Sequence, residues 1–270
     1  MRAIRTLTLF GGVFMLALAA VFVFQVPLAT RLWPWPDGRY SYLFIGSILA
    51  AAGAAMLWTG WTGKTGALPA GSLNIFVIGL TTMIYFFQPV IQQEHSNMIP
   101  FAIASLLTAI ASGASFLWSH RLPFNDPRPT PRLVRISFGM FIASLLLAGG
   151  ALLLQVPIFP WALNPNSSVI FGCIFIGDAF YFLYSLLRPR WENAFGQLLS
   201  FLAYDLVLII PFLALFPTVK SEHRVNLIVY TVVLIYSGCL AIYFLFIHPQ
   251  TRASTHERSQ NGFRQDGRRT

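Results

Sequence analysis

Predominantly apolar residues form eight long runs along this chain, separated by short polar or proline-rich stretches. Each run holds roughly 20 residues, the length that an α-helix needs to cross about 30 Å of hydrocarbon. The pattern therefore predicts an all-α integral membrane protein with eight transmembrane helices. Their expected limits are 7–26, 41–60, 69–88, 98–119, 133–155, 167–187, 196–216 and 226–248.

Composition supports this class. Of 270 residues, 56% are hydrophobic and 10% are charged, whereas about a quarter of the residues of a soluble domain are charged. The formal charge of +9 arises from basic residues in the loops, where they set topology. We therefore expect the lipid bilayer as the main partner and no nucleic acid.

The distribution of basic residues predicts the orientation. With the N-terminus inside, only four of the 18 lysines and arginines fall in outer loops: Arg31, Arg39, Lys220 and Arg224. Cytoplasmic loops usually hold the excess of basic residues. We expect both termini in the cytoplasm and the protein in the plasma (inner) membrane, with a disordered basic tail over 250–270.

The two halves of the chain resemble each other. Gln25-Val26-Pro27 recurs as Gln155-Val156-Pro157, and Ser41 and Gly46 match Ser167 and Gly172, at separations of about 126 to 130 residues. One duplicated four-helix unit explains these matches. We expect two parallel repeats, over 1–121 and 133–249, joined by a proline-rich cytoplasmic linker over 122–132.

Two aspartates stand inside predicted spans. Asp178 and Asp205 each lie eleven residues from the outer end of a span, so both are expected ~16 Å deep. Ionised carboxyls at that depth cost several kcal/mol, which favours a neutral acid, a shared proton or a bound cation. Because the two spans are neighbours along the chain, we expect the carboxyls to face each other.

Two tyrosines accompany these acids. Tyr181 lies on the same helical face as Asp178, and Tyr204 precedes Asp205, so their hydroxyls are candidates for a proton or ion pathway. The simpler interpretation is that each aspartate forms a buried hydrogen bond that fixes helix packing. The acids have no acidic counterparts in the first half, where Ala52 and Leu80 stand at the equivalent positions.

A repeated Glu-His pair suggests a second site. Glu94 and His95 match Glu222 and His223 in the outer loops, and a two-fold arrangement would bring four metal-binding side chains together. A related idea pairs His95 with His223 and His120 with His248 as ligands of two haems. Polar loop residues that are simply solvated are the plainer explanation.

Three functional hypotheses follow from these features. The first is a transporter or channel for a proton, a cation or a small solute, with Asp178 and Asp205 as the exchanging groups and Pro211 allowing helix movement. The second is a membrane-embedded metal- or haem-binding enzyme or redox subunit. The third is a non-catalytic assembly or scaffold subunit. Whether the chain is an enzyme, and which cofactors it binds, stay open at this stage.

Overall fold

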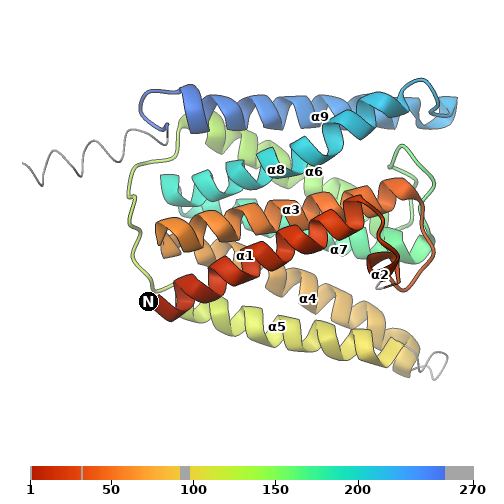
Figure 1. The fold of residues 1–270 in the computed structure, drawn as a ribbon, viewed down its shortest axis with the longest axis horizontal. Helices are drawn as coiled ribbons and strands as arrows, with labels where there is room; N and C mark the ends of the chain where they lie inside the picture. Colours follow the sequence, from red (N-terminus) through yellow and green to blue (C-terminus); the bar gives the residue numbers. More distant parts are fainter. Residues whose placement is uncertain (1, 32, 92–97, 253–270) are drawn as a thin grey trace, which may run out of the picture.

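The structure is a computed structural model that describes residues 2–31, 33–91 and 98–252. Within these ranges it is all-helical, and eight of its helical segments are long and apolar enough to cross a membrane, as predicted. The long helices run side by side (Figure 1). They are α1 (Arg2–Val23), α3 (Arg39–Thr62), α4 (Leu68–Ile91), α5 (Ile99–Ser119), α6 (Arg132–Leu153), α7 (Pro165–Leu187), α8 (Trp191–Leu215) and α9 (Arg224–Ile242).

Short helical turns connect some of the long helices. They are α2 (Pro27–Thr30), η1 (Thr65–Ala67) and η3 (Ser221–His223), and the five-residue π-helical turn η4 (Tyr243–Ile247) extends α9. The last helix of the bundle therefore begins with a tight turn and ends with a wide one. Helix α8 continues through Pro211 to Leu215.

Two predicted helix starts lie five residues too late: α1 begins at Arg2 rather than at 7, and the second case is α8. Helix α8 begins at Trp191, five residues before the predicted start at 196, so the basic turn between α7 and α8 contracts to 188–190. The polar residues Glu192, Asn193 and Gln197 interrupt the apolar run and hide this start. All three are nevertheless buried, because the linker after α5 covers the first turns of α8.

The long helices pack as four antiparallel hairpins. Two further interfaces join these hairpins to one another. Helix α1 packs against α3, α4 against α5, α6 against α7, and α8 against α9. Between the hairpins, α3 packs against α8 and α4 against α7, whereas α7 touches α8 much less than it touches α4 or α6. The neighbours in sequence on either side of the 188–190 turn are therefore not the main packing partners.

Helices α3 and α7 lie at the centre, and α1, α5, α6 and α9 form the outside. About half or more of the most apolar window of α3 and α7 is buried, against 11% for α5. Large apolar side chains face outward from the peripheral helices, for example Phe10, Leu107, Leu147 and Val232. Lipid chains rather than water are the natural surroundings of such a surface.

Small residues allow close approach within the hairpins. A Cβ atom on Gly79 of α4 would lie 2.9 Å from the backbone nitrogen of Ala109 of α5. A Cβ atom on Gly172 of α7 would lie 2.9 Å from the carbonyl oxygen of Gly149 of α6. Contacts of this kind stabilise helix pairs where lipid offers no hydrophobic drive for association.

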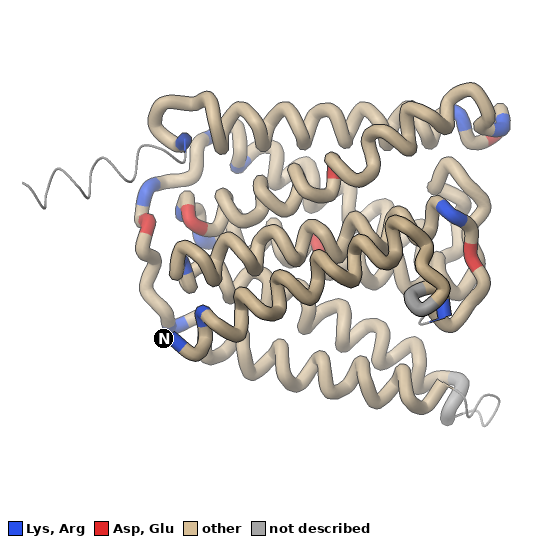
Figure 2. Tube along the Cα trace, in the orientation of Figure 1, with Lys and Arg blue, Asp and Glu red and all other residues tan. Residues whose placement is uncertain are grey.

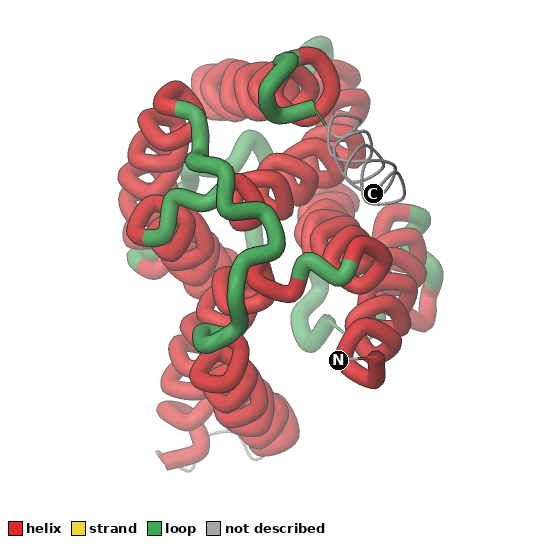
Figure 3. Tube along the Cα trace, turned by 90° about the vertical axis from the view of Figure 1, so that its left-hand side faces the viewer, coloured by secondary structure: helices red, strands yellow, loops and turns green. Residues whose placement is uncertain are grey.

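The segment between α5 and α6 crosses the end of the bundle where the described chain begins and ends (Figure 3). It pairs with the α7–α8 turn through a bridge between Pro129 and Arg190. The backbone nitrogen of Trp191 donates to the carbonyl oxygen of Arg128 at 2.7 Å. This end, called the linker end below, therefore binds both halves of the chain.

Candidate functional site

Asp178 lies part-way along α7 and accepts a hydrogen bond from α4. The amide Nδ2 of Asn74 donates to its Oδ1 at 2.8 Å. The other oxygen, Oδ2, has no hydrogen-bond partner among the described residues, and it is not among the fully covered polar atoms. The residue is half-buried at mid-length of α7, so one of its carboxyl oxygens can accept a further hydrogen bond.

The α4–α7 interface around Asp178 contains further polar contacts. Near the end opposite the linker, the hydroxyl of Tyr85 donates to Oδ1 of Asn166 at 2.7 Å. Because α4 and α7 run antiparallel, this contact lies on the same interface as the hydrogen bond from Asn74 to Asp178. The eleven residues between Asn74 and Tyr85 correspond to ~16 Å of helix, so polar groups recur along about half of a span.

Asp205 lies in α8 and faces α9 rather than Asp178. The hydroxyl of Ser237 lies 3.0 Å from Oδ1 and 2.9 Å from Oδ2 of this carboxyl, and 2.8 Å from the carbonyl oxygen of Val233. A hydroxyl has one proton to donate. A neutral Asp205 can therefore donate from one carboxyl oxygen to Ser237 while Ser237 donates to Val233, which leaves the other carboxyl oxygen without a donor.

The two carboxyls do not face each other as expected. Within the described part of the chain, no hydrogen bond joins Asp178 to Asp205, and their partners belong to α4 and α9 respectively. The reason is the packing: α7 is drawn to α4 and α8 to α3 and α9. Figure 2 shows acidic positions part-way along α7 and α8, with most other charges at the ends of the bundle.

Three tyrosines lie within electrostatic range of the acids. The hydroxyl of Tyr204 on α8 bonds that of Tyr230 on α9, and both carboxyls lie within electrostatic range of both rings. The hydroxyl of Tyr181 lies within reach of Asp178 and of Ser200 on α8. Of the predicted pathway residues, Tyr181 therefore accompanies Asp178 and Tyr204 bridges towards α9; the partner Tyr230 was not predicted.

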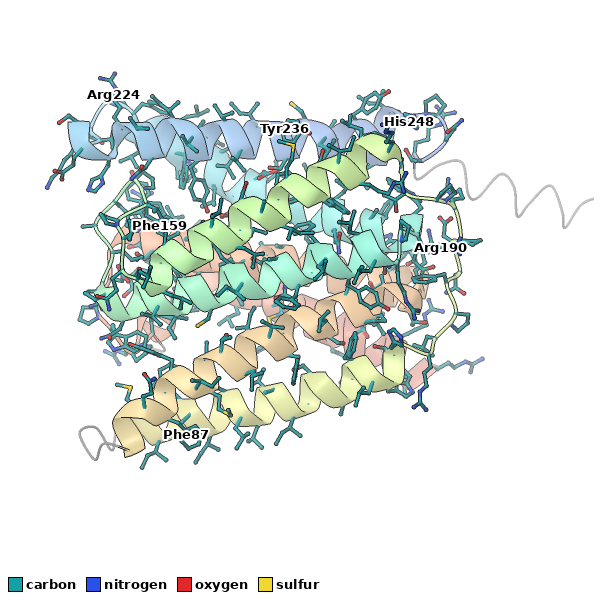
Figure 4. All side chains as sticks on the ribbon, turned by 180° about the vertical axis from the view of Figure 1, so that it is seen from behind. Phe87, Phe159, Arg190, Arg224, Tyr236 and His248 are labelled. Atoms are coloured by element: carbon teal, nitrogen blue, oxygen red, sulfur yellow. The ribbon has the colours of Figure 1, made fainter. Side chains whose placement is uncertain are left out.

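The predicted metal residues are only partly described. Glu94 and His95 lie outside the described residues. Nε2 of His223 lies 3.5 Å from Oε1 of the exposed Glu222, in the loop that Figure 4 marks by Arg224. In the described ranges, no three or more His, Cys, Asp or Glu side chains gather as a metal site would require.

Two of the four histidines of the haem hypothesis, His120 and His248, lie at the linker end. Both ring nitrogens of His120 have partners, Tyr184 at Nδ1 and Arg188 at Nε2, at 3.3 and 2.8 Å. The guanidinium has no acceptor, so it donates to Nε2 and occupies that lone pair. His248, labelled with Arg190 at this end in Figure 4, lies 3.2 Å from the hydroxyl of Thr251.

A buried charged cluster at the linker end was missed by the sequence reasoning. The carboxylate of Glu192 accepts backbone N–H bonds from Gly66 at 2.9 Å, Asn125 at 2.6 Å and Asp126 at 2.8 Å. Glu192 is completely buried. It therefore ties α8 to the α3–α4 turn and to the linker. The sequence did contain one indication of this cluster: Glu192 is an acidic residue that directly follows the arginine-rich turn.

Asp126 belongs to the same cluster. It pairs with Arg128 at 2.7 Å and with Lys64 at 3.6 Å. Burial alone raises the pKa of Asp126, but the hydrogen bonds and charge of Arg128 and the charge of Lys64 outweigh it, so the pKa lies below its ordinary value. Asp126 is thus held in the ionised form.

Comparison of the chain with models of protein families gives no match, and neither curated protein sequences nor solved structures provide one.

Proposed function

We propose that this chain is a multi-pass membrane transporter or channel that exchanges a proton, or a cation in its place, at Asp178. One observation supports this most directly: a half-buried carboxyl at mid-length of α7 has one oxygen held by Asn74 and the other without a protein partner. A structural aspartate would be expected to have both oxygens satisfied. An oxygen left available is suited to binding and releasing a small cation.

The surroundings of Asp178 favour alternation between two states. Its near neighbours are the neutral Asn74 amide and the hydroxyls of Tyr181, Tyr204 and Tyr230. An ionised carboxyl at this depth is costly without a cation, whereas a neutral one needs only hydrogen bonds. The residue therefore gains a proton or cation readily and releases it when a water path opens.

Asp205 has a supporting role in this proposal. Its bond to Ser237 lies at the α8–α9 interface, and the Tyr204 to Tyr230 pair connects it electrostatically with Asp178. The two acids would act as one coupled pair through tyrosines rather than through direct contact.

We also propose that the scaffold is a pair of parallel four-helix repeats with both termini in the cytoplasm of a plasma membrane. The two cross-interfaces, α3–α8 and α4–α7, are the pair that a two-fold axis exchanges. Gln25 and Gln155 have the same unusual positive φ, 51° and 57°. The indole of Trp33 donates to Ser167 and that of Trp161 to Ser41, both at 3.0 Å.

The test is a pH titration of the purified chain in liposomes by infrared spectroscopy of the carboxyl C=O stretch. Asp178→Asn is expected to remove a protonated-carboxyl band that the unaltered chain shows. Asp37→Asn, at the opposite end of the bundle from the linker, is the matched control and should leave that band unchanged. In parallel, a membrane potential imposed across the liposomes should drive a flux of protons or cations. The double variant Asp178→Asn with Asp205→Asn should abolish this flux.

Two results would contradict the proposal. If Asp178→Asn leaves the infrared titration unaltered, Asp178 does not exchange protons. If the double variant is folded and its flux equals that of the unaltered chain under proton, sodium and potassium gradients, the aspartates serve packing, as the assembly-subunit hypothesis expects.

A further inference from the structure

Buried polar atoms without a protein partner concentrate near the linker end of α7 and α8. Among the described residues, five of the seven such atoms belong to this region. Each of the five residues is at most 4% exposed. The atoms are Thr130 Oγ1, Ser185 Oγ, Trp191 Nε1, Asn193 Oδ1 and Gln197 Oε1.

Three of these residues, Ser185, Asn193 and Gln197, belong to α7 and α8. Asn193 and Gln197 are four residues apart on α8 and therefore share one face. Nδ2 of Asn193 donates to the carbonyl oxygen of Arg188 at 3.0 Å, and Nε2 of Gln197 donates to that of Tyr181 at 2.6 Å. Both amides are thus anchored against α7 by their nitrogens, and their oxygens stay unpaired.

Ser185 completes this row from the α7 side. It lies between Tyr181 and Arg188, the two residues whose carbonyl oxygens anchor the amides. Serines in membrane helices often donate to a carbonyl of their own helix, but this hydroxyl is unpaired. The three unpaired groups therefore belong to the same stretch of about two helical turns at the linker end of α7 and α8.

The row leads towards Asp178. Gln197 contacts the backbone of Tyr181, whose hydroxyl lies within reach of Ser200 and of Asp178. Buried polar groups are almost always paired with protein or with ordered water, and a buried water bonds two to four such groups. Helix α7 makes few contacts with α8, so the unpaired groups on these two helices are not paired with each other.

We propose that Asn193, Ser185 and Gln197 hold a chain of ordered waters that conducts protons between the linker end and Asp178. The inference rests on the proposed function of Asp178. A proton from the solution at the linker end enters the first water, each water passes one proton onward, and the Asp178 carboxylate becomes the neutral acid. The reverse sequence returns the proton. The three residues position waters and do not themselves titrate.

The experiment follows hydrogen–deuterium exchange at the Asp178 carboxyl in the full chain in liposomes. The infrared band is assigned by its loss in Asp178→Asn, and its shift is timed after transfer into D₂O. Asn193→Leu, Gln197→Leu and Ser185→Ala are each expected to slow the shift by about tenfold or more, a change of one order in rate. Ser112→Ala is the matched control, because Ser112 in α5 bonds a carbonyl of its own helix, and its rate should be unchanged.

Three outcomes distinguish the ideas. A slowed shift with an unchanged final titration supports the water chain. An unchanged rate in all three folded variants overturns it while leaving the proposed function standing. Absence of the Asp178 band from the unaltered chain overturns the proposed function and this inference together.

Ser185→Ala keeps the test decisive if the leucine variants fail to fold, because it removes only a hydroxyl. If that hydroxyl has no water partner, its removal should raise the thermal stability and leave the exchange rate unaltered. That result would overturn the proposal. A slower exchange with unchanged or lower stability would support it.

Discussion

The α4–α7 and α3–α8 interfaces both join one hairpin of the bundle to another, but they differ in chemistry. Amide, carboxyl and phenol groups meet across α4–α7, at Asn74 with Asp178 and at Tyr85 with Asn166. Aromatic packing dominates α3–α8, where Trp58 stacks on Phe195 with centroids 4.7 Å apart and Phe44 meets Tyr204 edge-on.

The difference shows what each interface contributes. Aromatic burial gives stability without a need for polar partners, so α3–α8 is suited to hold the hairpins together. Polar groups in a membrane core are expensive unless they are paired, and α4–α7 includes a carboxyl that is only half paired. This cost on one of the two interfaces supports the proposed role of Asp178.

The largest expected loss of stability comes from removing Glu192, which ties the α3–α8 and α4–α7 interfaces together at the linker end. Glu192 of α8 bonds Gly66, which precedes α4, together with Asn125 and Asp126. Glu192→Ala should lower the free energy of unfolding by about 3–5 kcal/mol, because it leaves three N–H groups without their acceptor. Denaturant titration in detergent measures this loss, with exposed Glu222→Ala as the control. A loss equal to that control would mean that the cluster does not join the halves.

The two interfaces also differ in how tightly a glycine is enclosed. A Cβ atom on Gly177 of α7 would lie 2.8 Å from Oδ1 and 3.0 Å from the carbonyl oxygen of Asn74. Gly177→Ala should therefore destabilise the chain by about 1–3 kcal/mol through overpacking. On Gly196 of α8, a Cβ atom would meet Trp58 at an ordinary 3.4 Å, so Gly196→Ala should be neutral or stabilise by up to about 1 kcal/mol. Equal midpoints in thermal unfolding for the two variants would remove this distinction.

Two tryptophans allow a test of the proposed two-fold symmetry, which would give their indole N–H groups equivalent surroundings. Trp33→Phe and Trp161→Phe each remove one N–H donor, to Ser167 and to Ser41 respectively. Each should cost about 1 kcal/mol, and the two costs should agree. The matched control is Trp61→Phe, whose side chain is 78% exposed. Unequal losses in unfolding midpoint would argue against equivalent surroundings.

The smallest expected effect concerns acid pH. Because the folded-state pKa of Asp126 is lowered, its stabilising contribution is fully present above its unfolded pKa of about 4 and is lost as pH falls through the folded value. Asp126→Asn should therefore weaken the dependence of stability on pH below about 4 and leave the proton exchange at Asp178 unchanged. Unfolding midpoints measured across this pH range for both chains would show the difference, and identical pH profiles would refute the assignment.

The sequence predicted some parts of the site better than others. Apolar runs located the eight long apolar helices, and Asp178 and Asp205 lie inside two of them. The sequence could not give their partners, because Asn74 lies 104 residues from Asp178 and nothing in the local pattern relates the two. Glu192 was overlooked for the same reason: its bonds are to backbone groups of distant loops, which have no residue signature.

What the sequence determined by itself is the set of helices. Transfer of apolar side chains from water and the need to satisfy every backbone group within a span are local requirements that the order of residues meets directly. Only the tertiary structure decided that Asp178 faces α4 and Asp205 faces α9, that the linker covers the start of α8, and that unpaired polar atoms concentrate near the linker end of α7 and α8. These features depend on which helices meet, and that choice is made by packing between segments far apart in the chain.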